Sequence, residues 1–333
     1  MARGNEAVMD EKLEQVAETG RLLLERALVA RTWGNFSARL DSDSFCITPS
    51  GLGYEHMTAE DIVRCRVSDG THEGTRKPSS EKGIHAAAYR LFPDVGFVIH
   101  THQTYATALS LSDPEQLPIT AEETERLGGI AWADYGLPGT KKLCHAVSAA
   151  MEQGAHTVLM AHHGALICGR DRADAMERAA LLEEVCRRSC LGQPDEAAAE
   201  AAGVSPEYFR KVYPTADIES SAPVRAWAAL KLPLPAQLDD MAQMMGSSLP
   251  VAENEKDALK LLEKHNSVFL PGTGVVVRGD DESDSEALGL LTRKAAVAAL
   301  HCRALGKSNC LSRMDCLVMR TFYLVKYAKR KRG

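Results

Sequence analysis

The chain has 333 residues, of which 45% are hydrophobic and 25% charged, a balance typical of a soluble globular protein with a sizeable core. This length allows one large domain or two small ones. The net charge of −6 and the pI near 6.0 argue against nucleic acid or an acidic membrane surface as a partner.

No apolar run is long enough to cross a membrane, and the N-terminus shows no apolar signal-peptide core. We therefore expect neither a membrane span nor export. The nine cysteines form no C-x-x-C pair, which predicts reduced thiols in a cytoplasmic protein.

The N-terminal part of the chain predicts one long helix followed by short strands. Apolar residues recur at helical spacing over 10–29, and the pattern stops at a loop around Gly34 and Asn35. Strands are expected at 36–40, 44–48 and 62–67.

The middle of the chain predicts layered helices and strands. A helix from 80 to 91 leads into the apolar strand 97–99, whose unbroken hydrophobic run indicates burial on both faces. The expected elements that follow are helices at 103–109, 140–152 and 171–188, and strands at 129–133, 156–160 and 165–168. This mixture predicts an α/β sandwich on a mainly antiparallel or mixed central sheet.

The composition changes after residue 193. Three prolines lie close together at positions 223, 233 and 235, which suggests a linker that we place at 216–240. We therefore expect a first domain at 1–215 and a smaller second domain at 241–333.

The second part also contains a partial repeat of the first. The stretch 267–281 parallels 157–171 at a constant offset of 110 residues, with Gly274 at the place of Gly164. Thr273 stands at the place of His163, so we expect a degenerate α/β half-repeat without a second metal site. Two unrelated strand–turn–strand units are the alternative interpretation.

Histidines at two predicted strand ends, together with a glutamate, suggest a metal site. Residues i and i+2 of a strand point to the same face, so His100 and His102 can chelate one ion. The pair His162 and His163 offers a third nitrogen. Three protein nitrogens with an open position are typical of a catalytic site, and imidazole suits Zn²⁺, Mn²⁺, Fe²⁺ and Co²⁺. Each histidine alone would more often be an ordinary core or surface residue.

Glu81 lies at the start of the predicted helix 80–91. Its carboxylate could simply be favoured there by the helix dipole. Alternatively, it completes the metal shell and shuttles a proton, as a carboxylate beside a metal ion can do.

Three loops of small polar residues could together hold a phosphate group. They are Gly34–Asn35, Ser50–Gly51 and Ser79–Ser80. Backbone amides and hydroxyl groups in such loops bind phosphate without a lysine. Each loop alone is an ordinary turn, and only their combination with the metal site favours a phosphorylated substrate.

These motifs, in this order, resemble the class II aldolase/adducin family over residues 8–192. The similar stretches are 34–37, 48–51, 77–81, 100–102 and 162–164. The resemblance implies a three-layer α/β/α sandwich with a mainly antiparallel central sheet. It also implies a homo-oligomeric, metal-dependent aldolase that cleaves a phosphorylated ketose through a metal-stabilised enediolate. Zn²⁺ is the metal most typical of the family, with Mn²⁺ or Co²⁺ also feasible.

The resemblance assigns roles to individual residues. His100, His102 and His163 match the metal ligands, whereas His162 does not, and Glu81 matches the acid/base that also approaches the metal. The positions that match the phosphate-binding residues are Gly34, Asn35, Ser50, Gly51, Ser79 and Ser80.

The chain departs from the family aldolases at one catalytic position. Their tyrosine, supplied across a subunit interface, has no counterpart here, and Glu122 or Glu123 occupies its neighbourhood. A glutamate there resembles the methylthioribulose-phosphate dehydratases of the same family, which usually lack the equivalent of Glu81. The two glutamates could also be no more than an exposed helix start.

Aldol cleavage is therefore the leading prediction. Dehydration and decarboxylation of a sugar-acid phosphate are the neighbouring alternatives, and a non-catalytic, adducin-like scaffold is a further one.

Overall fold

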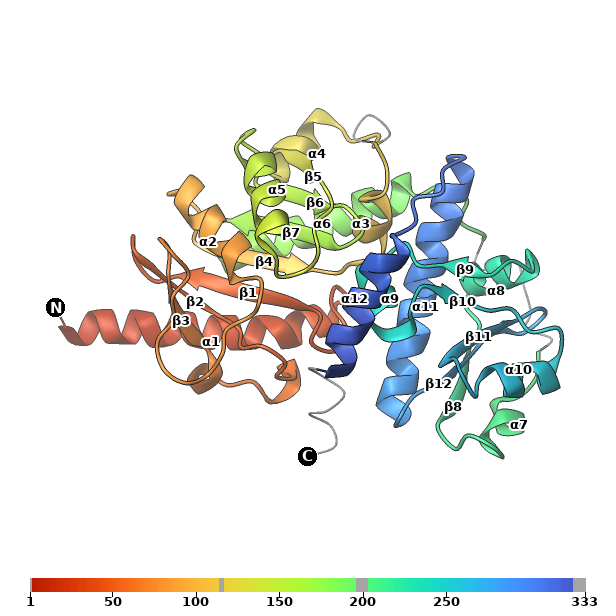
Figure 1. The fold of residues 1–333 in the computed structure, drawn as a ribbon. Coiled ribbons are helices and arrows are strands. Elements are labelled where there is room, and N and C mark those ends of the chain that lie inside the picture. Colours follow the sequence, from red (N-terminus) through yellow and green to blue (C-terminus); the bar gives the residue numbers. More distant parts are fainter. Residues whose placement is uncertain (1, 114–116, 196–202, 326–333) are drawn as a thin grey trace. The chain divides into compact units, whose positions relative to one another are not determined.

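The computed structural model describes residues 2–113, 117–195 and 203–325, with side chains from residue 7 onward. The chain forms two compact units, Met1–Ser189 and Cys190–Gly333. Figure 1 shows their elements. Within the described ranges, no helix combines the length and hydrophobicity that crossing a membrane requires.

A seven-stranded sheet forms the centre of the first unit, with strand order β3-β2-β1-β4-β7-β6-β5. The strands are β1 Gly34–Arg39, β2 Ser44–Ile47, β3 Val63–Arg66, β4 Phe97–Thr101, β5 Ile130–Ala133, β6 Thr157–Met160 and β7 Gly164–Gly169. Neighbouring strands are antiparallel except β5 and β6, which are parallel. The prediction of a mixed α/β fold with a mainly antiparallel central sheet is thus confirmed.

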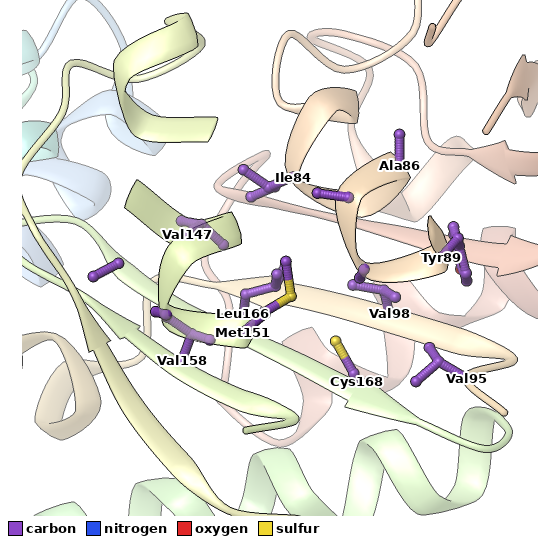
Figure 2. Close-up of a cluster of buried hydrophobic side chains, with 14 of the residues drawn as sticks. Ile84, Ala86, Tyr89, Val95, Val98, Val147, Met151, Val158, Leu166 and Cys168 are labelled. Atoms are coloured by element: carbon purple, nitrogen blue, oxygen red, sulfur yellow. The ribbon is translucent and has the colours of Figure 1, made fainter. Parts of the chain in front are cut away.

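Helices pack against both faces of this sheet. The helices of the first unit are α1 Ala2–Glu25, α2 Lys82–Leu91, α3 Thr104–Leu109, α4 Ala121–Arg126, α5 Lys141–Met151 and α6 Arg172–Ser189, with short 3₁₀ turns at Tyr54–His56 and Ala59–Asp61. On one face, α2 and α5 share a hydrophobic core with strand residues such as Val98, Leu166 and Cys168. Figure 2 shows this cluster, in which Ile84 of α2 and Val147 of α5 are drawn together with the strand residues Val98 and Leu166. Helices α1, α3 and α6 also contact the sheet.

The strand β4 lies in the middle of the sheet and is buried along its whole length. It extends past the predicted end at Ile99 to Thr101, so that His100 lies within the strand. Because side chains alternate between faces, His100 lies on the same face as Val98, the face covered by α2.

The second unit contains a three-stranded sheet in the order β11-β12-β8 and a separate pair, β9 and β10. The strands are β8 Ala216–Glu219, β9 Leu234–Pro235, β10 Ser248–Leu249, β11 Ser267–Leu270 and β12 Gly274–Arg278. The helices are α7 Pro206–Arg210, α8 Ala222–Ala229, α9 Asp239–Met245, α10 Glu255–Leu261, α11 Glu282–Ala304 and α12 Arg313–Tyr323.

The linker expected at 216–240 is not present, because β8, α8 and β9 lie within it and β8 pairs with β12. Pro223 lies in the first turn of α8, where a missing N–H removes no helical hydrogen bond. Pro235 lies in the two-residue strand β9, which pairs only with β10. Two of the three prolines thus belong to regular elements, Pro233 directly precedes β9, and the boundary between the units follows Ser189.

Two hairpins, one in each unit, have the same register. Met160 pairs with Gly164 in β6–β7, and Leu270 pairs with Gly274 in β11–β12. A Cβ atom at Gly164 would lie 2.2 Å from a backbone oxygen of β4, and one at Gly274 would lie 2.4 Å from a backbone oxygen of β8. In both hairpins the glycine therefore allows close approach to a neighbouring strand.

Candidate metal centre

Three separate elements bring four potential metal ligands together. His100 lies in β4 and His102 just after it, His163 lies in the turn between β6 and β7, and Glu81 directly precedes α2. One potential ligand atom from each residue falls within a group whose members all lie within 4.8 Å of one another. The structure thus places side by side the four residues that the sequence suggested as ligands.

The Nε2 atoms of the three histidines converge. His100 Nε2 lies 3.1 Å from His102 Nε2 and 3.1 Å from His163 Nε2. The two carboxylate oxygens of Glu81 lie 3.2 Å from His100 Nε2 and 3.0 Å from His163 Nε2. Lone pairs and negative charge directed at one point are best compensated by a cation, and this donor set fits Zn²⁺, Mn²⁺ or Co²⁺.

A backbone contact orients the ring of His100. Its Nδ1 atom lies 2.8 Å from the carbonyl oxygen of Ala165, which can only accept a hydrogen bond. A ring that binds a metal ion through Nε2 would therefore carry its proton on Nδ1, where it donates to Ala165. An outer contact of this kind is typical of histidines that bind metals.

The turn between β6 and β7 separates the two adjacent histidines. His162 has the left-handed φ of 65°, and the amide of His163 donates a 3.0 Å hydrogen bond to Met160. His163 is 2% exposed and faces the cluster. His162 instead lies edge-on to Tyr135, with ring centroids 5.2 Å apart. The turn thus presents only His163 to the site.

Glu81 occupies the N-cap position of α2, yet its side chain makes no capping hydrogen bond. Its carboxylate is 9% exposed and faces His100 and His163. Burial opposes ionisation, but the two histidines outweigh it and hold the pKa of Glu81 well below its usual value. The geometry therefore favours the interpretation of Glu81 as part of the site over that of a simple helix-start residue.

Two of the three small polar loops run side by side. The amides of Ser50 and Ser79 each donate a 3.0 Å hydrogen bond to a carbonyl group of the facing loop. These two amides are therefore used within the protein. Gly51 and Ser80 are exposed, and their amides are better placed to meet a phosphate group.

The third loop contacts the cluster directly, and its predicted part in phosphate binding stays a prediction. Gly34 has φ of 117°, and a Cβ atom there would lie 2.6 Å from the carbonyl oxygen of His100. Asn35 is 4% exposed; its Nδ2 donates to Glu81 over 3.0 Å, and its Oδ1 lies 2.6 Å from Nε2 of His85. The Asn35 side chain thus holds Glu81 in place. The sequence contained a signal for His85, since residues four apart on a helix lie on one side.

Neither Glu122 nor Glu123 of the same chain belongs to the cluster. Glu123 forms a capping box with Thr120 at the start of α4 and an ion pair with Arg188. Glu122 is exposed in the first turn of α4. The carboxylate of Glu123 therefore caps α4 and pairs with Arg188, whereas that of Glu122 faces solvent.

A pocket of about 390 Å³ borders the start of α2, with Ser80, Glu81 and Lys82 in its wall. The three clustered histidines do not line it. We therefore locate the chemistry at the histidine cluster and not in this pocket.

Comparisons with known proteins identify the family of this chain. The family model described as the class II aldolase and adducin N-terminal domain matches residues 14–190. The chain is 33% identical over 167 residues to an L-fuculose phosphate aldolase from Methanococcus maripaludis. This alignment covers 50% of this chain and 89% of the relative.

Solved structures are similar to a little more than half of the chain. A putative aldolase/epimerase/decarboxylase from Klebsiella pneumoniae is 26% identical with a TM-score of 0.50, covering 54% of this chain and 88% of that one. An L-fuculose 1-phosphate aldolase is 30% identical with a TM-score of 0.48, covering 60% and 92% of the two chains. Class II aldolases use a divalent metal ion, which the cluster of three histidines and Glu81 could bind. On the family match and the similarity to the Methanococcus enzyme, the chain belongs to the class II aldolase/adducin family.

Proposed function

We propose that the chain is a divalent-metal-dependent aldolase that cleaves a phosphorylated ketose. The observation that carries this proposal is the convergence of His100, His102, His163 and Glu81 within 4.8 Å. The three histidines would hold the ion, with Zn²⁺ as the first choice and Mn²⁺ or Co²⁺ as alternatives. Once bound, the ion would act as a Lewis acid toward the carbonyl and hydroxyl oxygens of the ketose.

Glu81 is the proposed proton carrier. Retro-aldol cleavage breaks one carbon–carbon bond, and the electron pair stays on the ketose half. The departing aldehyde loses its hydroxyl proton, and the ketose half gains a proton at carbon, so the products are an aldehyde and a triose phosphate without any redox change. Glu81 is held by Asn35 over 3.0 Å, and a carboxyl group fixed in this way can take up a proton from water and deliver it at carbon.

Other residues would bind the phosphate group and remove the hydroxyl proton. We assign the phosphate group to the paired loops, with Gly51 and Ser80 as direct contacts because both are exposed. We assign removal of the hydroxyl proton to Glu122 of a second subunit in a homo-oligomer, because this carboxylate is exposed and outside its own cluster.

We further propose that the second unit is a shortened copy of the first that has lost the chemistry. The matching hairpin registers support this proposal, as does the antiparallel pairing of β7 with β4 and of β12 with β8. Aligned through these registers, the positions of the three histidines hold Ile218, Ser220 and Thr273. The Thr273 hydroxyl lies 3.4 Å from the amide of Val204, so the chain itself covers this position.

A turnover screen tests the proposed reaction. Purified protein is supplied with Zn²⁺, Mn²⁺ or Co²⁺ and a panel of phosphorylated ketoses and sugar acids, and the products are identified by mass. An aldehyde and a triose phosphate are the expected products. Loss of water would instead identify a dehydratase, the second candidate, which the glutamate at position 122 favours. Release of carbon dioxide would identify a decarboxylase.

Two neighbouring histidines provide a matched pair of variants. His102→Ala should lose both bound metal and turnover, whereas His162→Ala should keep its metal because that side chain lies outside the cluster. A folded His102→Ala protein with full metal content would overturn the assignment. A wild-type protein that binds no divalent ion and turns over nothing would favour an adducin-like scaffold.

A further inference from the structure

A line of buried hydrogen bonds leads from Glu81 into the core between α2 and β1. Asn35 Nδ2 donates to Glu81 over 3.0 Å, and His85 Nε2 lies 2.6 Å from Asn35 Oδ1. On the other side of its ring, His85 Nδ1 lies 2.7 Å from Ser37 Oγ, which in turn lies 2.8 Å from the hydroxyl of Tyr89. Five side chains are thus joined end to end.

The secondary structure explains why these side chains meet. Asn35 and Ser37 are two residues apart in β1 and point to the same face, and His85 and Tyr89 are four apart on α2. All four are at most 4% exposed. Buried polar groups are unfavourable unless their hydrogen bonds are satisfied, so this arrangement requires a specific set of donors and acceptors.

One arrangement of protons satisfies the whole line. Asn35 Nδ2 donates to Glu81, so the Asn35 oxygen faces His85 and accepts from it. His85 must then carry its proton on Nε2. Burial, with a smaller effect from His100, lowers the pKa of His85 to about 3, so its ring is neutral and Nδ1 accepts from Ser37.

We propose that His85 is a positioning residue, which fixes the orientation of the Asn35 amide and thereby holds Glu81 between His100 and His163. This inference rests on the proposed function, because a fixed carboxylate matters only if Glu81 serves a metal ion and a proton transfer. Without His85, the Oδ1 atom of Asn35 loses its hydrogen-bond partner, and the amide is held from the Glu81 side alone. An Asn35 oxygen turned toward Glu81 would repel the carboxylate from its place.

The first test needs neither metal nor substrate. Nitrogen-15 spectra of histidine-labelled, metal-free protein report which ring nitrogen of each histidine carries the proton, and His85→Gln assigns the signal. We expect His85 to be protonated on Nε2 alone at neutral pH. Protonation on Nδ1 would overturn the inference even if the protein is an aldolase. Failure of the wild type to bind any divalent ion would instead overturn the proposed function.

The second test compares variants of α2 by their affinity for Co²⁺, measured in competition with a chelating dye. His85→Phe should lower the affinity by about tenfold, as loss of an outer-shell partner typically does. His85→Gln keeps one hydrogen-bond donor and one acceptor, so its Co²⁺ affinity should be closer to that of the wild type. Ile84→Ala is the matched control, because Ile84 is equally buried on α2 but belongs to the apolar core.

A merely structural role predicts a different pattern. If Ile84→Ala, at a similar loss of thermal stability, weakens Co²⁺ binding as much as His85→Phe does, the inference is wrong. Wild-type Co²⁺ affinity in His85→Phe would also overturn it. Should His85→Phe fail to fold, Ser37→Ala removes the hydroxyl that orients the His85 ring. Unchanged Co²⁺ affinity in that variant would count against the proposal, and reduced affinity would support it.

Discussion

Gly164 offers the sharpest test of how the hairpin holds the site together. In Gly164→Ala, the new Cβ atom would lie 2.2 Å from the carbonyl oxygen of Thr101 and 3.3 Å from Cα of His102. Real Cβ atoms essentially never come closer than 3.0 Å to such an atom, so β4 and the hairpin must separate by roughly 0.8 Å. Overpacking of this kind costs about 1–3 kcal/mol of stability.

The same displacement should weaken metal binding. His102 follows β4 and His163 directly precedes Gly164, so the separation moves ligands on both sides of the site. Functional sites tolerate displacements of about 0.5 Å, and we therefore expect at least about a tenfold loss of Zn²⁺ or Co²⁺ affinity. Chelator competition measures the affinity, and chemical denaturation measures the stability.

Two other glycines supply the controls. Gly274→Ala creates a similar 2.4 Å contact with Glu219, at a positive φ, but among the described residues no cluster of potential ligands includes this position. It should lose stability and keep its metal affinity. Gly53→Ala meets nothing within 4 Å and should be nearly neutral in both measurements. The reasoning is refuted if Gly164→Ala loses stability but binds metal as tightly as Gly274→Ala.

Three further predictions concern pH, the two glutamates and the metal. Because His85 has a pKa of about 3 when folded and 6.5 when exposed, acid protonates the unfolded chain first, so stability falls as the pH drops below about 6.5. Between pH 7 and pH 5, wild type should lose about 2 kcal/mol more unfolding free energy than His85→Gln, and equal losses would contradict a neutral buried ring. Glu123→Gln should lower stability through its capping box, whereas Glu122→Gln should lower turnover alone; the reverse pattern in thermal and kinetic assays would exchange their roles. Zn²⁺ at about 100 times its dissociation constant should raise the unfolding free energy by about 2.7 kcal/mol, and a chelator should remove this gain; an unchanged melting temperature would argue against a site in the folded protein.

The potential ligands could be predicted from the sequence because local geometry determines most of their placement. His100 and His102 share a strand face through their spacing alone, whichever strands lie beside β4. The choice between His162 and His163 depends on the left-handed turn at His162, which no pattern of residue types specified. The prediction of His163 as the ligand therefore came from the family resemblance and not from residue spacing.

The role of Asn35 was not predictable in the same way. As a small polar residue in a glycine loop, it suggested phosphate binding. Its partners Glu81 and His85 come from another part of the chain, and only the packing of α2 on β1 brings them within 3.0 Å and 2.6 Å. The prolines of 216–240 were misinterpreted for a related reason, since proline is equally suited to a linker and to the first turn of a helix.

The β11–β12 hairpin suggests which residues are kept for folding after a catalytic activity has been lost. On the proposed duplication, the second unit lost all three histidines but retained Gly274, because a glycine at this place is required for the strands to meet at all. Selection for folding can thus preserve a glycine after selection for catalysis has ended. For inactive descendants of such enzymes, glycine spacing would then be a more durable record of ancestry than the histidines that once defined the reaction.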